Sequence, residues 1–126
     1  MTELSVAPIV AVVDDDESVR ESLASLAESV GYDVALFGSA EEFLKEVRDL
    51  NGFHCLILDV RLPGISGIEL HSQLTARGRS IPTILITAHA DPLVAMKPGV
   101  IAVLYKPFQP EVLLQAVRSA IAESRM

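Results

Sequence analysis

The chain has 126 residues, of which half are apolar and 21% are charged, and its net charge is −7 at pH 7. This length and composition are typical of one globular domain that buries its own core, and they exclude a disordered chain. The acidic balance disfavours direct nucleic-acid binding, which needs a basic face.

There is no secretory signal at the N-terminus and no apolar run long enough to span a membrane. A single cysteine, Cys55, excludes an internal disulfide and fits a reducing compartment. We therefore expect a cytoplasmic protein with no membrane contact.

Five short apolar runs predict five strands. The runs are rich in Val, Ile and Leu and are nearly continuous rather than alternating, which is typical of strands buried on both faces of a parallel sheet. In chain order they cover residues 9–13, 33–37, 54–58, 82–87 and 100–105.

Amphipathic segments lie between these runs and predict helices. The first carries Val19, Leu23, Leu26 and Val30 on one helical stripe, with Gly31 where the helix would end. Strands that alternate with helices along the whole chain predict an α/β fold, in which right-handed crossovers join parallel strands and cover both faces of the sheet.

The starts of two later helices are marked by capping-box spacing. Ser39 stands three residues before Glu42, and Ser66 stands three residues before Glu69. The last helix is predicted over residues 111–124, where apolar residues again recur at helical spacing.

Polar side chains follow four of the five predicted strands. Because the carboxyl ends of parallel strands meet at one edge of a sheet, we expect these side chains to converge there. They are Asp14, Asp15 and Asp16 after the first strand, Asp59 and Arg61 after the third, Thr87 at the end of the fourth and Lys106 after the fifth. Repulsion within this acidic group predicts that Lys106 and a bound cation neutralise it.

The chemistry of these residue types indicates magnesium and phosphate. Carboxylate and carbonyl oxygens suit Mg²⁺, whereas the His or Cys set that zinc prefers is missing. A carboxylate at a strand end can accept a phosphoryl group, and a lysine and a threonine can stabilise the oxygens in transfer. Neither a P-loop nor a dinucleotide-binding glycine pattern occurs in the sequence.

Four segments together resemble the receiver domain of bacterial two-component response regulators: VVDDDESVRESL, LILDVRLPGISGIEL, PTILITAHAD and VLYKPF. The resemblance covers about residues 8–122, so we expect residues 1–126 to form a single receiver domain. VDDDESVRESL and YDVALFGSAEEFL are similar to the FixJ-type branch of transcriptional regulators. The resemblance implies a flavodoxin-like, doubly wound, five-stranded parallel sheet of order 2-1-3-4-5 with five helices.

The resemblance also implies a role for each residue at the predicted edge. Asp59 would be the phosphoacceptor, and Lys106 would pair with the phosphoryl oxygens and be joined to Pro107 by a cis bond. Thr87 would relay phosphorylation to the outer surface. The Mg²⁺ ligands would be Asp15 directly, Asp14 in support, Asp59, and the backbone carbonyl of Arg61. Asp16 is left for a solvated or helix-capping role.

Two features depart from the family pattern. Val103 stands where the family usually has an aromatic residue that responds to the strand-end threonine, and Tyr105 directly precedes Lys106 instead. The segment between Thr87 and Lys106 is also shorter than in common receivers, by nearly one helical turn. We therefore expect a fourth helix that is short or irregular, confined to about residues 92–97. His89 is either near the phosphoryl group or a plain loop residue.

The main functional hypothesis is a signalling switch. A sensor histidine kinase or a phosphotransfer protein would phosphorylate Asp59 with Mg²⁺ present, and the domain would catalyse only its own phosphorylation and dephosphorylation. A longer natural chain would carry a helix-turn-helix output domain for transcription regulation. The sequence does not decide whether the domain forms a homodimer. One alternative is a phosphorylation-independent interaction module that uses the atypical fourth-helix surface. Another is a small phosphatase, but Arg61 occupies the place of the second acid that such an enzyme needs.

Overall fold

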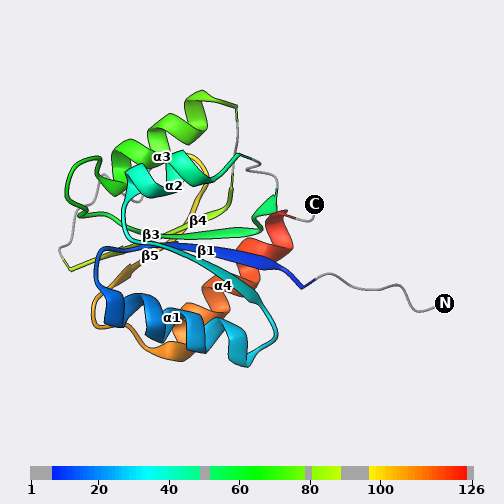
Figure 1. Cartoon of the computed structure of the whole chain (residues 1–126). Helices are drawn as coiled ribbons and strands as arrows, with labels where there is room; N and C mark the ends of the chain where they lie inside the picture. The colour runs from blue at the N-terminus through cyan, green and yellow to red at the C-terminus, as the bar shows by residue number, and fades with distance from the viewer. Residues whose placement is uncertain (1–6, 49–51, 79–80, 89–96, 125–126) are drawn as a thin grey trace.

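A computed structural model describes residues 7–48, 52–78, 81–88 and 97–124. It contains one five-stranded sheet in the order β2-β1-β3-β4-β5, and every pair of neighbouring strands is parallel (Figure 1). The strands are β1 (Ile9–Val13), β2 (Asp33–Phe37), β3 (Cys55–Asp59), β4 (Thr83–Thr87) and β5 (Val100–Tyr105). The predicted strands, their direction and their order are therefore confirmed, with bounds that differ by at most one residue.

The described part of the chain contains four helices. They are α1 (Glu17–Ser29), α2 (Ala40–Glu46), α3 (Gly67–Ala76) and α4 (Pro110–Ser124). The label α4 thus belongs to the C-terminal helix, which was the fifth in the prediction. The predicted fourth helix, at residues 92–97, lies outside the described residues except for Lys97, which is not helical. Its short or irregular form stays a prediction.

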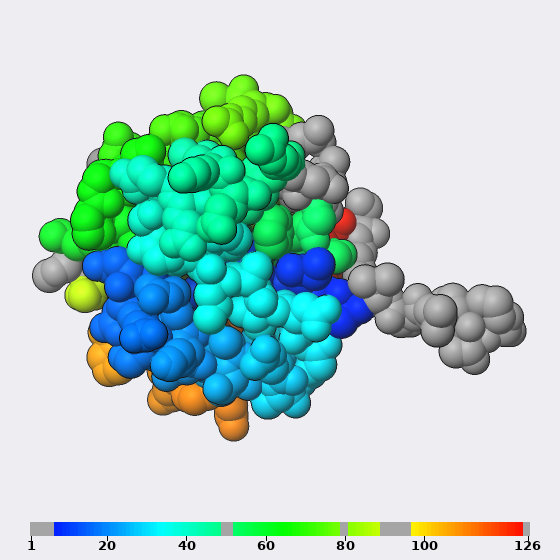
Figure 2. Space-filling view, in the orientation of Figure 1, coloured from blue at the N-terminus to red at the C-terminus, as the bar shows by residue number. Residues whose placement is uncertain are grey.

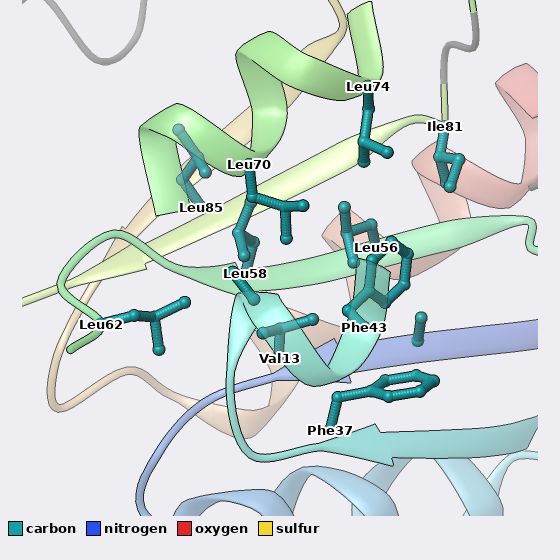
Figure 3. Close-up of a cluster of buried hydrophobic side chains, with 12 residues drawn as sticks. Val13, Phe37, Phe43, Leu56, Leu58, Leu62, Leu70, Leu74, Ile81 and Leu85 are labelled. Carbon is teal, nitrogen blue, oxygen red and sulfur yellow. The ribbon is translucent and has the colours of Figure 1, made fainter. Parts of the chain in front are cut away.

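The helices cover both faces of the sheet and enclose two separate cores. α2 and α3 lie on one face, and α1 and α4 lie on the other (Figure 1). Figure 3 shows the first core, in which Phe43 of α2 and Leu70 of α3 point toward Leu56 and Leu58 of β3. All four of these side chains are completely buried. β3 is thus the central strand of the sheet and is buried along its whole length.

Strand position decides how much of each apolar run is buried. Every residue of β3 and β4 is buried, as the continuous runs predicted. The edge strands are less buried, because each has a neighbour on only one side: β2 has two half-buried and two exposed residues, and four of the six residues of β5 are half-buried. In Figure 2 the cyan surface of β2 reaches solvent beside α1 and α2, and Leu36 on this strand is 39% exposed. The prediction of burial on both faces was therefore wrong for the two edge strands.

Local capping sets the starts of the helices. Ser66 and Glu69 form the complete capping box predicted for α3. For α2 only half of the predicted box is present: Ser39 accepts a hydrogen bond from the Glu42 amide, but the Glu42 carboxylate accepts one from Gly38. At the end of α1, Val30 was predicted to lie on the buried stripe, yet it is 38% exposed because the helix ends at Ser29 and Val30 serves as its C-cap.

Candidate functional site

The end of β1 places two acids side by side in different environments. Asp14 is 1% exposed, and its amide extends the sheet by donating to the carbonyl of Phe37. Its Oδ1 atom accepts a hydrogen bond of 2.9 Å from the amide of Asp16. Asp15, the next residue, is exposed. Because side chains alternate along an extended chain, only one of these acids can point into the protein.

Asp16 has a separate task at the start of α1. Its carboxylate accepts hydrogen bonds from the amides of Ser18 and Val19, which makes it the N-cap of the helix. The hydrogen bond from the Ser18 hydroxyl lowers the pKa of Asp16, and the two backbone bonds act in the same direction. The predicted helix-capping role of Asp16 is confirmed.

Asp59 is the last residue of β3 and reaches the same edge of the sheet. It is 6% exposed, and its Oδ1 atom accepts a hydrogen bond of 3.0 Å from the amide of Arg61. The following residue, Val60, donates its amide to Ile86 of β4 at 2.9 Å, so the strand pairing continues past the carboxylate. The backbone of Asp59 is therefore fixed in a fully buried strand, and its carboxylate is fixed by the hydrogen bond from the Arg61 amide.

Lys106 joins the two buried acids. Its Nζ atom lies 3.1 Å from Oδ2 of Asp59 and 3.3 Å from Oδ2 of Asp14. The backbone of Lys106 is fixed next to β4, because its amide donates to the carbonyl of Thr87 at 2.8 Å. The Lys106–Pro107 bond is cis, as the resemblance implied. The predicted pairing of Lys106 with the aspartates is confirmed for Asp14 and Asp59.

Burial and charge act in opposite directions at this site. Burial raises the pKa of Asp14, with a further contribution from the negative charge of Asp59, despite the opposing hydrogen bond from Asp16 and the charge of Lys106. For Lys106, burial alone would lower the pKa, but the hydrogen bond to Asp59 and the two negative charges outweigh burial and raise it. Lys106 therefore keeps its proton at neutral pH, and it does not fully neutralise the two acids.

The remaining negative charge and the donor set fit a divalent cation. One carboxylate oxygen from each of Asp14, Asp15 and Asp59 lies within 4.8 Å of the other two. Three carboxylate oxygens in such a group are hard ligands of the kind that Mg²⁺ prefers, and one exposed acid leaves room for the waters that Mg²⁺ retains. The residues present therefore fit the predicted ion.

Thr87 ends β4 at the same edge, and its side chain is 2% exposed. Its partner in the sheet register is Tyr105 of β5, which is 48% exposed. Val103, two residues earlier on β5, packs against the core under α2 and α3. Thr87 thus lies between the acidic edge and an exposed aromatic ring.

Two histidines and the cysteine lie away from this edge. His54 precedes β3, and its ring accepts a hydrogen bond of 3.1 Å from the Ile9 amide, at the amino ends of the strands. His71 is buried on α3, and burial together with the charge of Lys97 lowers its pKa. Burial raises the pKa of the Cys55 thiol to about 12, in agreement with an inert cysteine. His89 lies outside the described residues.

Two residues that the sequence did not single out contact the backbone around the site. The Arg20 guanidinium donates a hydrogen bond of 2.6 Å to the carbonyl of Asp14. Glu41 of α2 accepts a hydrogen bond of 2.9 Å from the amide of Ile65, in the loop that follows β3. Arg20 stands in VVDDDESVRESL, only six residues from Asp14, and Glu41 stands in YDVALFGSAEEFL, 24 residues from Ile65; no spacing rule used for the sequence indicates either contact.

The fold and the acidic edge with its lysine define a receiver domain. The family model described as "Response regulator receiver domain" matches residues 10–118, and the chain therefore belongs to that family, the receiver domains of two-component response regulators. Within the described residues, no helix is long and apolar enough to cross a membrane.

Similar proteins include regulators of the FixJ type. Nodulation protein W of Bradyrhizobium diazoefficiens is 46% identical over 128 residues, which cover 98% of this chain and 56% of that protein. Transcriptional regulatory protein FixJ of Azorhizobium caulinodans is 46% identical over 116 residues, which cover 90% of this chain and 54% of that protein. The chain thus spans about half the length of the curated relatives that it matches, and the resemblance to the FixJ-type branch is confirmed.

Solved structures of receiver domains have the same fold. The response regulator StyR matches with a TM-score of 0.86 and 46% identity, over 95% of this chain and 62% of that one. The BeF3-activated receiver domain of DrrB matches with a TM-score of 0.77 and 30% identity, over 93% of this chain and 99% of that one.

Proposed function

We propose that Asp59 is the phosphoacceptor of a two-component phosphorelay. The observation that carries the proposal is the distance of 3.1 Å between Nζ of Lys106 and Oδ2 of Asp59, beside two further carboxylates. A lone buried ion pair would be a structural feature, but three clustered carboxylates with a single lysine keep an excess of negative charge, which is suited to binding a cation and, with it, a phosphoryl group.

The transfer moves one phosphoryl group from nitrogen to oxygen. The P–N bond of a phosphohistidine on the donor protein breaks, and a P–O bond to the Asp59 carboxylate forms. The leaving imidazole takes up a proton from solvent, and the product is an acyl phosphate. Because such transfers involve little covalent chemistry by the protein, the domain contributes position and charge.

Lys106 supplies fixed positive charge to this step. Its raised pKa means that it acts as a permanent ammonium group and not as a proton donor. Its position next to Oδ2 of Asp59 allows it to stabilise the negative oxygens that arrive with the phosphoryl group. Bound Mg²⁺, held by Asp14, Asp15, Asp59 and the carbonyl of Arg61, would supply further positive charge to the same oxygens.

The acyl phosphate would then bias the outer surface through Thr87. A hydroxyl that turns toward the phosphoryl group changes the space next to its register partner Tyr105, which is partly exposed. The proposal makes the domain a switch that catalyses only its own phosphorylation and dephosphorylation. In a regulator about twice this length, the switch would control a helix-turn-helix output domain and so transcription. A single buried cysteine supports a cytoplasmic location.

The proposal is tested by incubating the protein with Mg²⁺ and acetyl phosphate and measuring its intact mass. In a second measurement, BeF3 serves as a non-covalent mimic of the phosphoryl group, and its binding is followed by tyrosine fluorescence. We expect the wild-type chain to gain one phosphoryl group and Asp59→Asn to gain none. The proposal is overturned if the wild-type chain forms no adduct at saturating donor and Mg²⁺, or if the adduct persists in Asp59→Asn.

A further inference from the structure

The loop between β3 and α3 has to hold its shape for the proposed site to form. It runs from Val60 to Ser66 and contains Arg61, whose amide donates to Asp59 and whose carbonyl is a proposed Mg²⁺ ligand. A small shift of this backbone would displace both the amide and the carbonyl of Arg61. Whatever anchors the loop therefore affects the site.

Backbone contacts with β4 and α3 and the cap of α3 anchor the two ends of the loop. At the start, Val60 pairs with β4, and its carbonyl accepts a hydrogen bond of 3.0 Å from the amide of Gly67. At the end, Ser66 begins α3 with a complete capping box. With the Arg61 amide bonded to Asp59, these contacts leave the stretch from Leu62 to Ile65 to be held from elsewhere.

Helix α2 provides that support across 24 residues of sequence. The Glu41 carboxylate accepts a hydrogen bond of 2.9 Å from the amide of Ile65. This bond lowers the pKa of Glu41, so the carboxylate is the form that the contact favours. On the inner side, Leu62 of the loop belongs to the same buried cluster as Ala40 and Phe43 of α2.

Gly64 makes room for this contact. Its φ angle is +74°, a left-handed conformation that favours glycine. A Cβ atom at this position would collide with the Glu41 carboxylate. Glycine thus suits this position both for its backbone conformation and for the space next to the Glu41 carboxylate.

We propose that Glu41 is a positioning residue, which holds the β3–α3 loop so that the backbone of Arg61 is correctly placed for Mg²⁺ at Asp59. The inference rests on the proposed function and adds to it a residue outside the acidic edge. Glu41 touches none of the reacting atoms, so its effect passes through the loop.

Neighbouring Glu42 is a matched control. It is also an exposed acid in the first turn of α2, and it also accepts a hydrogen bond of 2.9 Å from a backbone amide. Its partner is Gly38, which lies before α2 and outside the loop after β3. Glu41→Ala and Glu42→Ala therefore remove the same charge from the same helix end, and only the first releases the loop.

The experiment measures Mg²⁺ affinity by calorimetric titration at 25 °C, after melts have shown that each variant is folded. We expect Glu41→Ala to weaken Mg²⁺ binding about tenfold, as loss of a group that orients a metal ligand typically does. Glu42→Ala should stay within about twofold of wild type. Glu41→Gln, which keeps an acceptor oxygen, should recover most of the affinity.

Two further readouts separate positioning from a general effect on stability. Phosphorylation by acetyl phosphate should be slow in Glu41→Ala at low Mg²⁺ and should recover at saturating Mg²⁺. The NMR signal of the Ile65 amide should move in Glu41→Ala and not in Glu42→Ala. Equal Mg²⁺ affinities of the two alanine variants, or an unmoved Ile65 signal, overturn the inference. A wild-type chain that takes up no phosphoryl group instead overturns the proposed function.

Discussion

The Nζ atom of Lys106 lies 3.1 Å from Oδ2 of Asp59, although 47 residues separate them in the chain. Lys106 directly follows β5, and Asp59 is the last residue of β3. In the sheet, β4 lies between these two strands. The lysine side chain therefore crosses the end of β4 to reach the carboxylate, and it contacts Asp14 at the end of β1 as well. One ammonium group thus connects three strands at the edge where the phosphoryl group is proposed to bind.

Lys106→Met should slow phosphorylation of Asp59 by about a hundredfold, because it removes a fixed charge aimed at the transferring oxygens. It should also lower the free energy of unfolding at pH 7 by about 1–3 kcal/mol, since two buried carboxylates lose their partner. The lysine side chain is 28% exposed, so the loss should be smaller than for a fully buried pair. Intact mass against time and urea unfolding measure the two effects.

The control for this variant is Lys45→Met on the exposed side of α2, which removes the same charge away from the site. It should leave the phosphorylation rate unchanged. A Lys106→Met variant that reacts as fast as Lys45→Met would show that the ammonium group has no part in the transfer.

Asp14→Asn should make the domain more stable at pH 7, by on the order of 1 kcal/mol, because asparagine keeps an acceptor oxygen but places no charge in this buried position. A carboxyl group whose pKa is higher in the folded than in the unfolded state binds its proton more tightly when folded. Its contribution to stability is therefore complete below its ordinary pKa of 3.8 and is lost as the pH rises through the raised pKa. The advantage of Asp14→Asn should accordingly shrink as the pH falls toward 4.

Urea unfolding of both proteins between about pH 4 and pH 8 measures this difference. A variant that is less stable than wild type at pH 7 would mean that the pairing with Lys106 outweighs the cost of burying the Asp14 charge. The same variant should bind Mg²⁺ more weakly, because it loses one of the three clustered carboxylates.

Mg²⁺ should stabilise the wild-type chain by mass action, by about 2.7 kcal/mol at a concentration one hundred times its dissociation constant. Asp15→Asn should remove most of this gain, because Asp15 contributes an oxygen to the cluster. Asp16→Asn should retain it, since Asp16 serves as the N-cap of α1 and asparagine caps helices equally well.

Thermal melts with and without Mg²⁺ compare these two neighbouring variants, which lose the same charge. If both lose the Mg²⁺ effect, the ion responds to the overall negative charge of this edge and not to a defined set of ligands. Ca²⁺ at the same concentration provides a check on ion type.

Gly67→Ala should destabilise the domain by about 1–3 kcal/mol, although alanine is intrinsically the better helix former. Gly67 is the first residue of α3, and a Cβ atom there would collide with the carbonyl oxygen of Asp59. The backbone of the proposed phosphoacceptor would have to move, so phosphorylation should slow as well. Unfolding in urea and intact mass measure both effects.

Gly52→Ala is the matched control, because a Cβ atom at Gly52 would have no neighbour within 4 Å. It should leave stability and phosphorylation nearly unchanged. Equal stability of the two variants would mean that α3 can shift away from β3 without cost.

Local patterns in the sequence predicted most of the architecture. The central strands were identified because short, uninterrupted apolar runs are typical of strands buried on both faces of a parallel sheet. The start of α3 was identified because a capping box involves residues only three positions apart. The edge where Asp59 and Lys106 meet followed from the direction of the strands, since parallel strands end together. The family motifs supplied the strand order.

The tertiary structure decided which groups at that edge make contact. The capping role of Asp16 was predicted from the sequence, but only the turn of the chain decided that Asp14 is buried beside Lys106 while Asp15 is exposed. The hydrogen bond from Ile65 to Glu41 also depends on how α2 packs beside the loop that follows β3. Sequence patterns encode neighbours within one element, whereas contacts of this kind depend on distances between elements that only the packed core sets.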